Sequence, residues 1–553
     1  MTTSLKRALV IVTLVAAAAA GVAAQVPAER LLRAAAEPAN WLIYSGSYMS
    51  QRYSALTQIT RANVGRLQMQ WILQATTIGS WQATPIVADG IMYVTQRPND
   101  IVALDAATGR VFWTYKYIPA QGQRACCGAN NRGLALLGDT LFMGTLDGHV
   151  VAVDANTGHL RWNTELAKFS DGYSVTLAPL VVKDKVIVGM GGAEYGIRGF
   201  ITALDAATGK EAWRFYTIPS PDEPGGESWP KDDVHWRHGG GSVWVTGSYD
   251  PSLNLTYWGV GNPGPDYNAA QRPGDNLYAN SVVAIDPDTG TLKWHFQFTP
   301  NDRYDWDATQ VPVLVDRDWN GTPAKLMLWA NRNGFFYVLD RVTGKFLLGK
   351  PFVKVNWATG LDANGRPRQT PQPDNEITWP GIQGGTNWYS PSYSPRTGLF
   401  YASVWEDYKG AFRSQFVQFE PGRGYGGGGF RMVPPVPDAP VTPNLRRGPM
   451  NTWTDALAHG AVIAIDPVSG ERKWTYSMYD VTDAGVLTTA SDLLFTGNRE
   501  GWFQALDART GELLWRTNLG AQINSAPITY EVGGTQYVSV AAGTVTAAFA
   551  IRP

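Results

Sequence analysis

The sequence predicts an all-β protein with the architecture of an eight-bladed β-propeller, and three observations carry this prediction. A short phrase built on Asp, Gly and Trp recurs along much of the 553-residue chain. Pairs of short apolar stretches, typical of strands, precede these phrases. The composition, with 22 Trp, 24 Tyr, 59 Gly and 35 Pro, suits a turn-rich β protein packed by aromatic side chains better than a helical one.

The recurring phrase is interpreted as a hairpin: a strand ending in Asp, a tight turn closed by Gly, and a second strand ending on Trp. The Asp can accept hydrogen bonds from turn amides, and the Gly can adopt the positive φ that the turn requires. The seven copies are ALDAATGRVFW (103–113), AVDANTGHLRW (152–162), ALDAATGKEAW (203–213), AIDPDTGTLKW (284–294), VLDRVTGKFLL (338–348), AIDPVSGERKW (464–474) and ALDARTGELLW (505–515). The copy at 338–348 lacks the Trp. We expect these residues to dock each blade on the next and to have no catalytic role.

The spacing of the copies fits one four-stranded blade for each copy. Successive copies begin 41 to 54 residues apart, except for two gaps of 81 and 126 residues that leave room for insertions. Strand pairs at 84–95 and 178–189 precede two of the hairpins. The longest gap can hold a further blade, and a final strand pair lies at 526–541, so the expected number of blades is eight.

The N-terminus predicts an export signal. Lys6 and Arg7 precede an apolar run over 8–20, and small residues at 22–24 suit a signal peptidase. We therefore expect a cleaved signal peptide over 1–24 and a single propeller domain over 25–553; the alternative is an uncleaved membrane anchor. No other stretch is apolar for long enough to span a bilayer, so no integral membrane segment is expected. An exported chain meets an oxidising compartment, in which its two cysteines are expected to form a disulfide.

The charge balance excludes one class of partner. The chain has 46 Lys and Arg against 47 Asp and Glu, for a net charge of −1. A protein whose main partner is nucleic acid or an anionic membrane normally carries a clear positive excess. Neither partner is expected here.

The only two cysteines, Cys126 and Cys127, stand side by side in the stretch RACCGANNRG. Together with the tryptophan-bearing repeat and the export signal, this pair resembles the pyrroloquinoline quinone (PQQ) dependent alcohol dehydrogenases of bacterial periplasms, over essentially the whole mature chain. The resemblance implies an eight-bladed propeller that binds PQQ and a metal ion near its axis, with a vicinal disulfide against one face of the quinone. A rigid, flat pair of sulfur atoms suits that position, whereas a bridge between neighbours closes no loop and adds little stability. The alternative is two unpaired buried thiols.

Three separate stretches offer hard oxygen ligands, which suit calcium or a lanthanide and not zinc or copper. They are GMGGAEYGIRG with Glu194, YWGVGNPGPDYN with Asn262, and TPNDRYDWDATQ with Asp305 and Asp307. The resemblance implies that these four residues bind the metal and that Asp305 is also the catalytic base. Asp307 matches the extra carboxylate of lanthanide-using members, and a trivalent ion favours a further anionic ligand, so a lanthanide is expected, with calcium as the alternative. By itself, the acidic stretch could equally be a solvated turn.

The resemblance also implies the residues that contact the cofactor. Trp244 would form the aromatic floor under the quinone, and the polar contacts would come from Arg132, Thr176, Arg332 and Asn387, with Trp388 lining the pocket. Each arginine could instead be an ordinary ion-pair partner. Three residues depart from the family pattern, namely Gln82 in place of Glu, Gly191 in place of Ser and Asp483 in place of Trp.

The implied activity is oxidation of an alcohol to an aldehyde or ketone in the periplasm, with hydride transfer to PQQ and a metal ion as Lewis acid. No C-x-x-C-H motif is present for a covalent haem, so a separate cytochrome c is the expected electron acceptor. Two alternatives stay open: a non-catalytic propeller scaffold, and a PQQ dehydrogenase that acts on a polyol or sugar. The identity of the alcohol and the existence of a homodimer also stay open.

Overall fold

The computed structural model of the chain describes residues 25–77, 79, 81–123, 125–433 and 458–551. The predicted signal peptide over 1–24 lies outside these residues. Almost all of the regular secondary structure in the described residues is β-strand, which confirms the all-β prediction. Its one α-helix is short, α2 (Ala28–Leu32), and six 3-10 turns are η1 (Ala34–Ala36), η2 (Val64–Arg66), η3 (Phe169–Asp171), η4 (Ala193–Tyr195), η5 (Gly226–Ser228) and η6 (Ala269–Gln271). Within the described ranges, no helix is long and apolar enough to cross a membrane.

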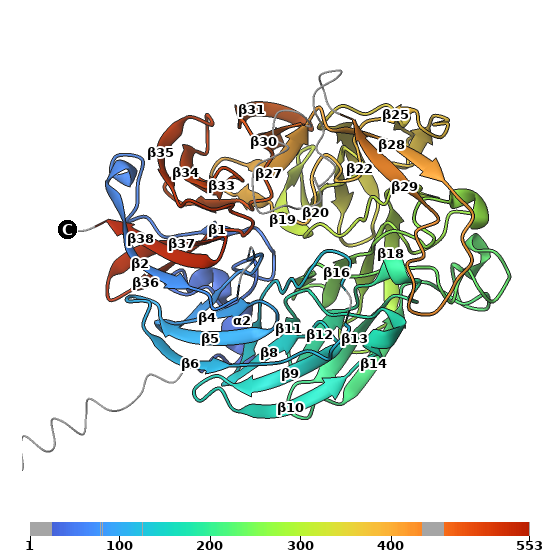
Figure 1. Cartoon of the computed structure of the whole chain (residues 1–553). Helices are drawn as coiled ribbons and strands as arrows, with labels where there is room; N and C mark the ends of the chain where they lie inside the picture. The colour runs from blue at the N-terminus through green and yellow to red at the C-terminus, as the bar shows by residue number, and fades with distance from the viewer. Residues whose placement is uncertain (1–24, 78, 80, 124, 434–457, 552–553) are drawn as a thin grey trace, which may run out of the picture.

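Eight sheets of four or five strands dominate the described residues, and Figure 1 shows them arranged around a common centre. The first four contain β3 (Ile86–Ala88), β4 (Ile91–Gln96), β5 (Asp100–Asp105) and β6 (Val111–Tyr115); β7 (Ala135–Leu137), β8 (Thr140–Gly144), β9 (His149–Asp154) and β10 (Leu160–Glu165); β11 (Leu180–Val182), β12 (Lys185–Gly189), β13 (Phe200–Asp205) and β14 (Glu211–Tyr216); and β15 (Ser248–Asp250), β16 (Leu255–Gly259), β17 (Ser281–Ile285) and β18 (Leu292–Gln297).

The remaining large sheets continue in chain order. They contain β19 (Val313–Trp319), β20 (Thr322–Ala330), β21 (Phe335–Asp340) and β22 (Phe346–Pro351); β26 (Ser392–Ser394), β27 (Leu399–Glu406), β30 (His459–Asp466) and β31 (Glu471–Ser477); β1 (Tyr53–Ser54), β32 (Leu487–Thr489), β33 (Leu493–Gly497), β34 (Trp502–Asp507) and β35 (Leu513–Asn518); and β2 (Leu67–Gln74), β36 (Ile528–Val532), β37 (Thr535–Ala542) and β38 (Val545–Ile551). Two small sheets pair β23 (Ala358–Leu361) with β24 (Pro367–Gln369), and β25 (Ile377–Thr378) with β28 (Lys409–Ser414) and β29 (Gly428–Val433).

The two ends of the described chain meet in one sheet. Strand β2 pairs antiparallel with β38, with Leu67 opposite Ile551 and Gln74 opposite Val545. A strand from the start of the chain therefore completes the sheet made by its end. This sheet also contacts the β3–β6 sheet, because Trp71 Nε1 in β2 donates to the Ala106 carbonyl at 3.0 Å, so the pairing closes the ring.

The predicted turn forms as expected in the first copy of the repeat. Asp105 Oδ1 accepts hydrogen bonds from the backbone N–H of Ala107 and Thr108, and Gly109 has φ +74°. In the first two copies the Trp that ends the hairpin bonds to the next sheet: Trp113 Nε1 donates to the carbonyl of Ala155 at 3.2 Å, and Trp162 Nε1 donates to that of Ala206 at 3.1 Å. The repeat thus links one sheet to its neighbour.

Strand order decides which loops share a face. Strands of a large sheet are mostly antiparallel to their neighbours, so connections leave the sheet at alternate ends. The Asp–Gly turn joins the third strand to the fourth. The end of the sheet opposite this turn carries two kinds of connection. One joins the second strand to the third, and the other joins the fourth strand to the next sheet. Side chains on these two kinds of connection therefore meet on a single face, which we call the site face.

Candidate functional site

Every residue predicted to bind the cofactor or metal lies on a connection of the site face. Second-to-third-strand connections carry three of them: Glu194 in η4 after β12, Asn262 after β16, and Arg332 after β20. Links between sheets carry the others, which are Cys126, Cys127, Arg132, Thr176, Trp244, Asp305, Asp307 and Asn387. Segments far apart in the sequence thus converge because the strand order brings them to one end of the sheets.

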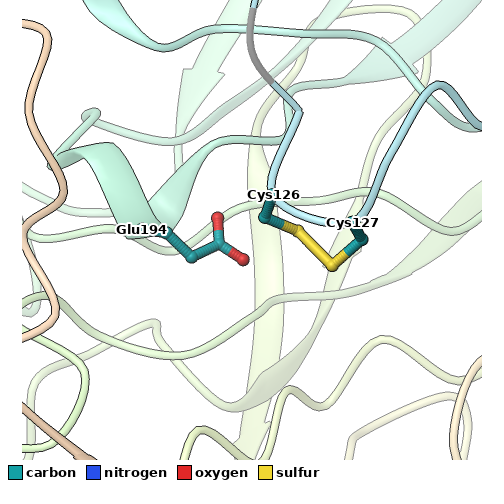
Figure 2. A group of neighbouring side chains, drawn as sticks. All are labelled: Cys126, Cys127 and Glu194. Carbon is teal, nitrogen blue, oxygen red and sulfur yellow. A yellow bond between two sulfur atoms is a disulfide. The ribbon is translucent and has the colours of Figure 1, made fainter. Parts of the chain in front are cut away.

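The vicinal disulfide between Cys126 and Cys127 is present, which confirms the predicted pairing and excludes two unpaired thiols. Figure 2 shows the Glu194 carboxylate directed toward the disulfide, and a carboxylate oxygen and both sulfur atoms lie within 4.8 Å of one another. Sulfur atoms bonded to each other are not thiolates and do not form a metal site with Glu194. Cys126 is exposed and Cys127 half-buried, so the disulfide presents a surface beside the predicted metal ligand.

An arginine lies between two tryptophans on the site face. The Arg132 guanidinium carbon is 4.8 Å from the ring centroid of Trp244 and 5.0 Å from that of Trp388. Arg132 Nη1 also donates to Thr176 Oγ1 at 3.1 Å. The predicted aromatic floor and two predicted polar contacts therefore come together in one group, with a buried positive charge between flat aromatic faces.

A second group centres on Arg332, which is 4% exposed. Its Nη1 donates to Asp307 Oδ2 at 2.5 Å, and its Nη2 lies 3.9 Å from Asp305 Oδ2. The predicted base Asp305, the predicted additional metal ligand Asp307 and the predicted cofactor contact Arg332 are therefore neighbours. Arg332 Nε is buried and has no hydrogen-bond partner among the described residues, so it is available to an acceptor that enters the site.

Asp305 is in an unusual local environment. It has φ +58°, a left-handed conformation uncommon for residues other than glycine and typical of functional sites. Burial raises the pKa of Asp305 well above its ordinary value; Arg332 opposes this rise, and the charges of Asp307, Asp266 and Glu194 add to it. These carboxylates repel one another, which disfavours the ionised form of each unless a cation joins them.

The structure adds one carboxylate that the sequence prediction missed. Asp266 is 3% exposed and its Oδ1 accepts a hydrogen bond from Asn262 Nδ2 at 2.9 Å. Burial raises the pKa of Asp266 well above its ordinary value, and the charges of Glu194 and Asp307 raise it further. Asp266 lies four residues after Asn262 in the stretch NPGPDYN. No pattern in the sequence assigned this Asp to the site.

Asn387 is buried in a loop that contacts Arg332. Its Nδ2 donates to the carbonyl of Gln383 at 3.1 Å, and in the same loop the carbonyl of Ile382 accepts from Arg332 Nη2 at 2.6 Å. Asp483, which departs from the family pattern, pairs with Arg499 at 2.6 Å. Asn387, Asp483 and Arg499 all lie on connections of the site face.

The donor set fits a hard metal cation. Glu194, Asp266, Asp305 and Asp307 influence one another electrostatically. Asn262 joins the group because its side-chain amide donates to Asp266 and its backbone N–H donates to Asp307. Arg332 offsets part of this negative charge. Carboxylate and amide oxygens with excess negative charge suit calcium or a lanthanide. The aromatic faces, the disulfide surface and two buried arginines likewise suit a flat, anionic, carbonyl-bearing cofactor such as PQQ.

Comparisons with known proteins agree with this geometry. Residues 41–357 and 477–538 match the family described as PQQ, "Glucose/ethanol/alcohol dehydrogenase, beta-propeller domain". The chain is 39% identical over 556 residues to quinohemoprotein alcohol dehydrogenase ADH IIB of Pseudomonas putida, across 97% of this chain and 77% of that protein. It is 36% identical over 579 residues to quinoprotein alcohol dehydrogenase PedH of the same species, across 98% and 93%. A solved europium-containing methanol dehydrogenase matches with a TM-score of 0.86 and 34% identity, across 94% of this chain and 92% of that one. The predicted propeller fold is confirmed.

Proposed function

The chain belongs to the family of PQQ-dependent alcohol dehydrogenases, and on this premise we propose that it oxidises an alcohol to an aldehyde or ketone with Asp305 as the base. The observation that carries the proposal is the grouping of Asp305, Asp307 and Arg332 on one face. The raised pKa of Asp305 makes its carboxylate a stronger base than an ordinary one, provided that a cation in the site keeps it ionised. Arg332 keeps this carboxylate oriented by its charge.

When bound, PQQ supplies the acceptor for the hydride that leaves the alcohol carbon, and a metal ion supplies the Lewis-acid charge that polarises the quinone. Trp244 and the Cys126–Cys127 disulfide would cover the two faces of the cofactor. Arg132, Thr176, Arg332 and Asn387 would hold its polar edge. Asp305 takes the proton from the substrate hydroxyl, and Arg332 provides a positive group on the same side.

We propose that the metal ligands are Glu194, Asn262, Asp305 and Asp307, and that the ion is a lanthanide. Asp307 supports this preference, because one more carboxylate favours a trivalent ion over calcium. Both Asp307 oxygens already accept a hydrogen bond, from Arg332 and from the backbone N–H of Asn262. Each carboxylate oxygen has a second lone pair, so these bonds can orient Asp307 without preventing it from binding a cation.

The finer architecture is also a proposal. We infer that the eight large sheets are the eight predicted blades, docked by the tryptophans of the repeat, and that residues 25–553 form one domain. We further propose export to the periplasm through the signal peptide over 1–24. We propose a separate cytochrome c as the electron acceptor.

One observation supports a second candidate substrate class. Asp483 and Arg499 form an ion pair on the site face, where the family pattern has a tryptophan. A charged pair can hydrogen-bond to several hydroxyl groups, whereas an indole presents an apolar surface. Oxidation of a polyol or sugar is therefore the alternative to oxidation of a simple alcohol.

The first experiment is dye-linked oxidation by purified protein with PQQ, using ethanol, an aromatic alcohol and glycerol as substrates, with calcium or lanthanum added. We expect turnover mainly with lanthanum. Turnover mainly with calcium would support the proposed enzymatic function and contradict the lanthanide preference. Absence of turnover and of quinone absorbance with either metal would favour the non-catalytic propeller scaffold.

The role of Asp305 is tested by Asp305→Asn, which keeps the size of the side chain but cannot accept a proton. We expect turnover to fall by about 10²–10⁴-fold, while the melting temperature and PQQ absorbance stay near those of the unsubstituted protein. Asp480→Asn, which changes another buried carboxylate outside the proposed machinery, is the matched control and should retain turnover. An Asp305→Asn variant with unchanged turnover contradicts the assignment.

A further inference from the structure

Asp266 is built into the predicted metal site through Asn262. The two residues lie four positions apart on the connection between β16 and β17, and both are almost fully buried, at 1% exposure for Asn262 and 3% for Asp266. Asn262 Nδ2 donates to Asp266 Oδ1 at 2.9 Å. A buried polar contact of this kind fixes the orientation of the amide, because few other partners are within reach.

This contact decides which end of the Asn262 amide faces the ligand group. An amide has a donor end and an acceptor end, and a carboxylate that a nearby cation keeps ionised can only accept. Asp266 therefore accepts from Nδ2 of Asn262. Oδ1 of Asn262, which can bind a cation, points away from Asp266. The backbone N–H of Asn262 donates in turn to Asp307 Oδ1 at 2.8 Å, so Asn262 is held between two carboxylates.

Asp266 is itself held in place by a buried arginine. Arg272 is 0% exposed; its Nη2 donates to the Asp266 carbonyl and its Nε to the Pro265 carbonyl, both at 3.2 Å. These bonds fix the backbone of the loop and leave the Asp266 carboxylate to Asn262. A ligand-orienting residue requires such support, because its own position must be constrained.

The charge of Asp266 acts on the same site. Its carboxylate is hydrogen-bonded to the proposed ligand Asn262, so an ion bound at the site lies within reach of its negative charge. Several buried carboxylates close together are unfavourable without a cation, and the penalty grows with each added charge. A trivalent ion compensates this group more completely than a divalent one.

Resting on the proposed function, we propose that Asp266 is a positioning residue of the metal site: it directs Asn262 Oδ1 toward the ion, and its charge favours a trivalent ion over calcium. It acts through Asn262 and through its field, and it is not one of the four proposed ligands.

The test measures metal binding by the metal-free protein and does not depend on turnover. Europium is titrated with its luminescence as readout, and calcium affinity is obtained by competition. Asp266→Asn removes the charge but keeps an oxygen that can accept from Asn262 Nδ2; Asp266→Ser also shortens the side chain. We expect Asp266→Asn to weaken europium binding by about 10–100-fold, with a smaller effect on calcium. Asp266→Ser should in addition shorten the europium luminescence lifetime, because a misoriented Asn262 admits water to the ion.

Asp480→Asn is the matched control, since it also removes a buried carboxylate but in a different group of side chains, and its europium affinity should not change. Each variant must show the metal-free melting curve of a folded protein; if Asp266→Asn does not fold, Asp266→Ser provides the comparison. Equal europium-to-calcium preference in the original and Asp266 variants would overturn the positioning role while leaving the proposed function intact. Absence of europium binding by the original protein would overturn both.

Discussion

At the scale of single residues, the carboxylates on the site face differ in the partners that surround them. Asp307 pairs closely with Arg332, whereas Asp305 lies farther from the same guanidinium and close to other carboxylates. Asp480 lies near Arg499, yet its Oδ2 is buried with no hydrogen-bond partner among the described residues. Asp307 is therefore suited to be a charged ligand and Asp305 to be a base. Asp480 is an acid whose ionised form destabilises the folded protein.

Replacing Asp307 with Ala should lower lanthanide affinity selectively. The substitution removes one negative charge from the proposed ligand set and frees Arg332 from its 2.5 Å contact, which leaves a positive charge near the ion. We expect europium affinity to fall by at least about 10-fold and calcium affinity to change less. The measurement is europium luminescence with calcium competition. Equal losses for both ions, or no loss, would count against a lanthanide-selecting role.

The raised pKa of Asp480 predicts that the stability of the folded protein depends on pH. Burial raises its pKa from 3.8 to about 7; Arg499 opposes this rise, while Asp483 and Glu500 add to it. The folded protein thus holds this proton more tightly than the unfolded chain does, so the stability contributed by protonated Asp480 is complete below about pH 4 and is lost as pH rises toward 7. The rise in pKa corresponds to at most roughly 4 kcal/mol.

We therefore expect Asp480→Asn to raise the melting temperature at pH 8 by several degrees and to change it little at pH 4, where Asp480 is already neutral. Thermal melting monitored by circular dichroism at the two pH values provides the measurement. A variant that melts at the same temperature as the original protein at pH 8 would show that Asp480 is ionised without cost in the folded state.

At the scale of elements, the hairpin repeat couples local turn geometry to docking between sheets. In the first copy, Gly109 takes a positive φ, and a Cβ there would come within 2.9 Å of the Trp71 ring. The same relation holds between Gly158 and Trp113. In the copy that lacks Trp, the Leu348 side chain lies against Gly470 instead, so a smaller side chain serves this contact.

Substitution of Trp162 tests this contact, because its ring packs against Gly209 and its Nε1 donates to the Ala206 carbonyl. Trp162→Ala should destabilise the protein by about 3 kcal/mol, since it removes a large ring from a packed junction. Trp162→Phe should cost less, because it keeps an aromatic ring and loses the hydrogen bond. Melting temperatures measure both effects, and an unaffected Trp162→Ala variant would show that the junction does not depend on the indole.

At the scale of the whole molecule, the proposed ligands come from connections of several different large sheets. Glu194 follows β12, Asn262 follows β16, and Asp305 and Asp307 precede β19. An ion bound to all of them ties these sheets together at the site face. Without it, the carboxylates repel one another across the junctions between sheets.

Metal binding should therefore stabilise the whole ring. Europium at about 100 times its dissociation constant should add roughly 2.7 kcal/mol to stability, seen as a higher melting temperature that a chelator reverses. The Asp307→Ala variant should show a smaller rise at the same europium concentration. If europium leaves the melting temperature of the original protein unchanged, the ion does not bind the folded protein specifically.

The sequence by itself determined the features that depend on neighbours in the chain. The repeat predicted the strands and Asp–Gly turns because turn geometry and strand alternation are local, and the adjacent cysteines predicted their own disulfide. The closing of the ring by β2 on β38 was not predicted, because it joins the two ends of the described chain.

Only the tertiary structure decided how the candidate site is assembled. It placed Arg132 between Trp244 and Trp388, and it brought Asp266 near Glu194. No local pattern marks such contacts, because they arise when antiparallel strands bring connections from different sheets to one face. Resemblance to a family supplied candidates for the ligands, but it assigned no role to Asp266, and the hydrogen bond from Asn262 joins this residue to the group.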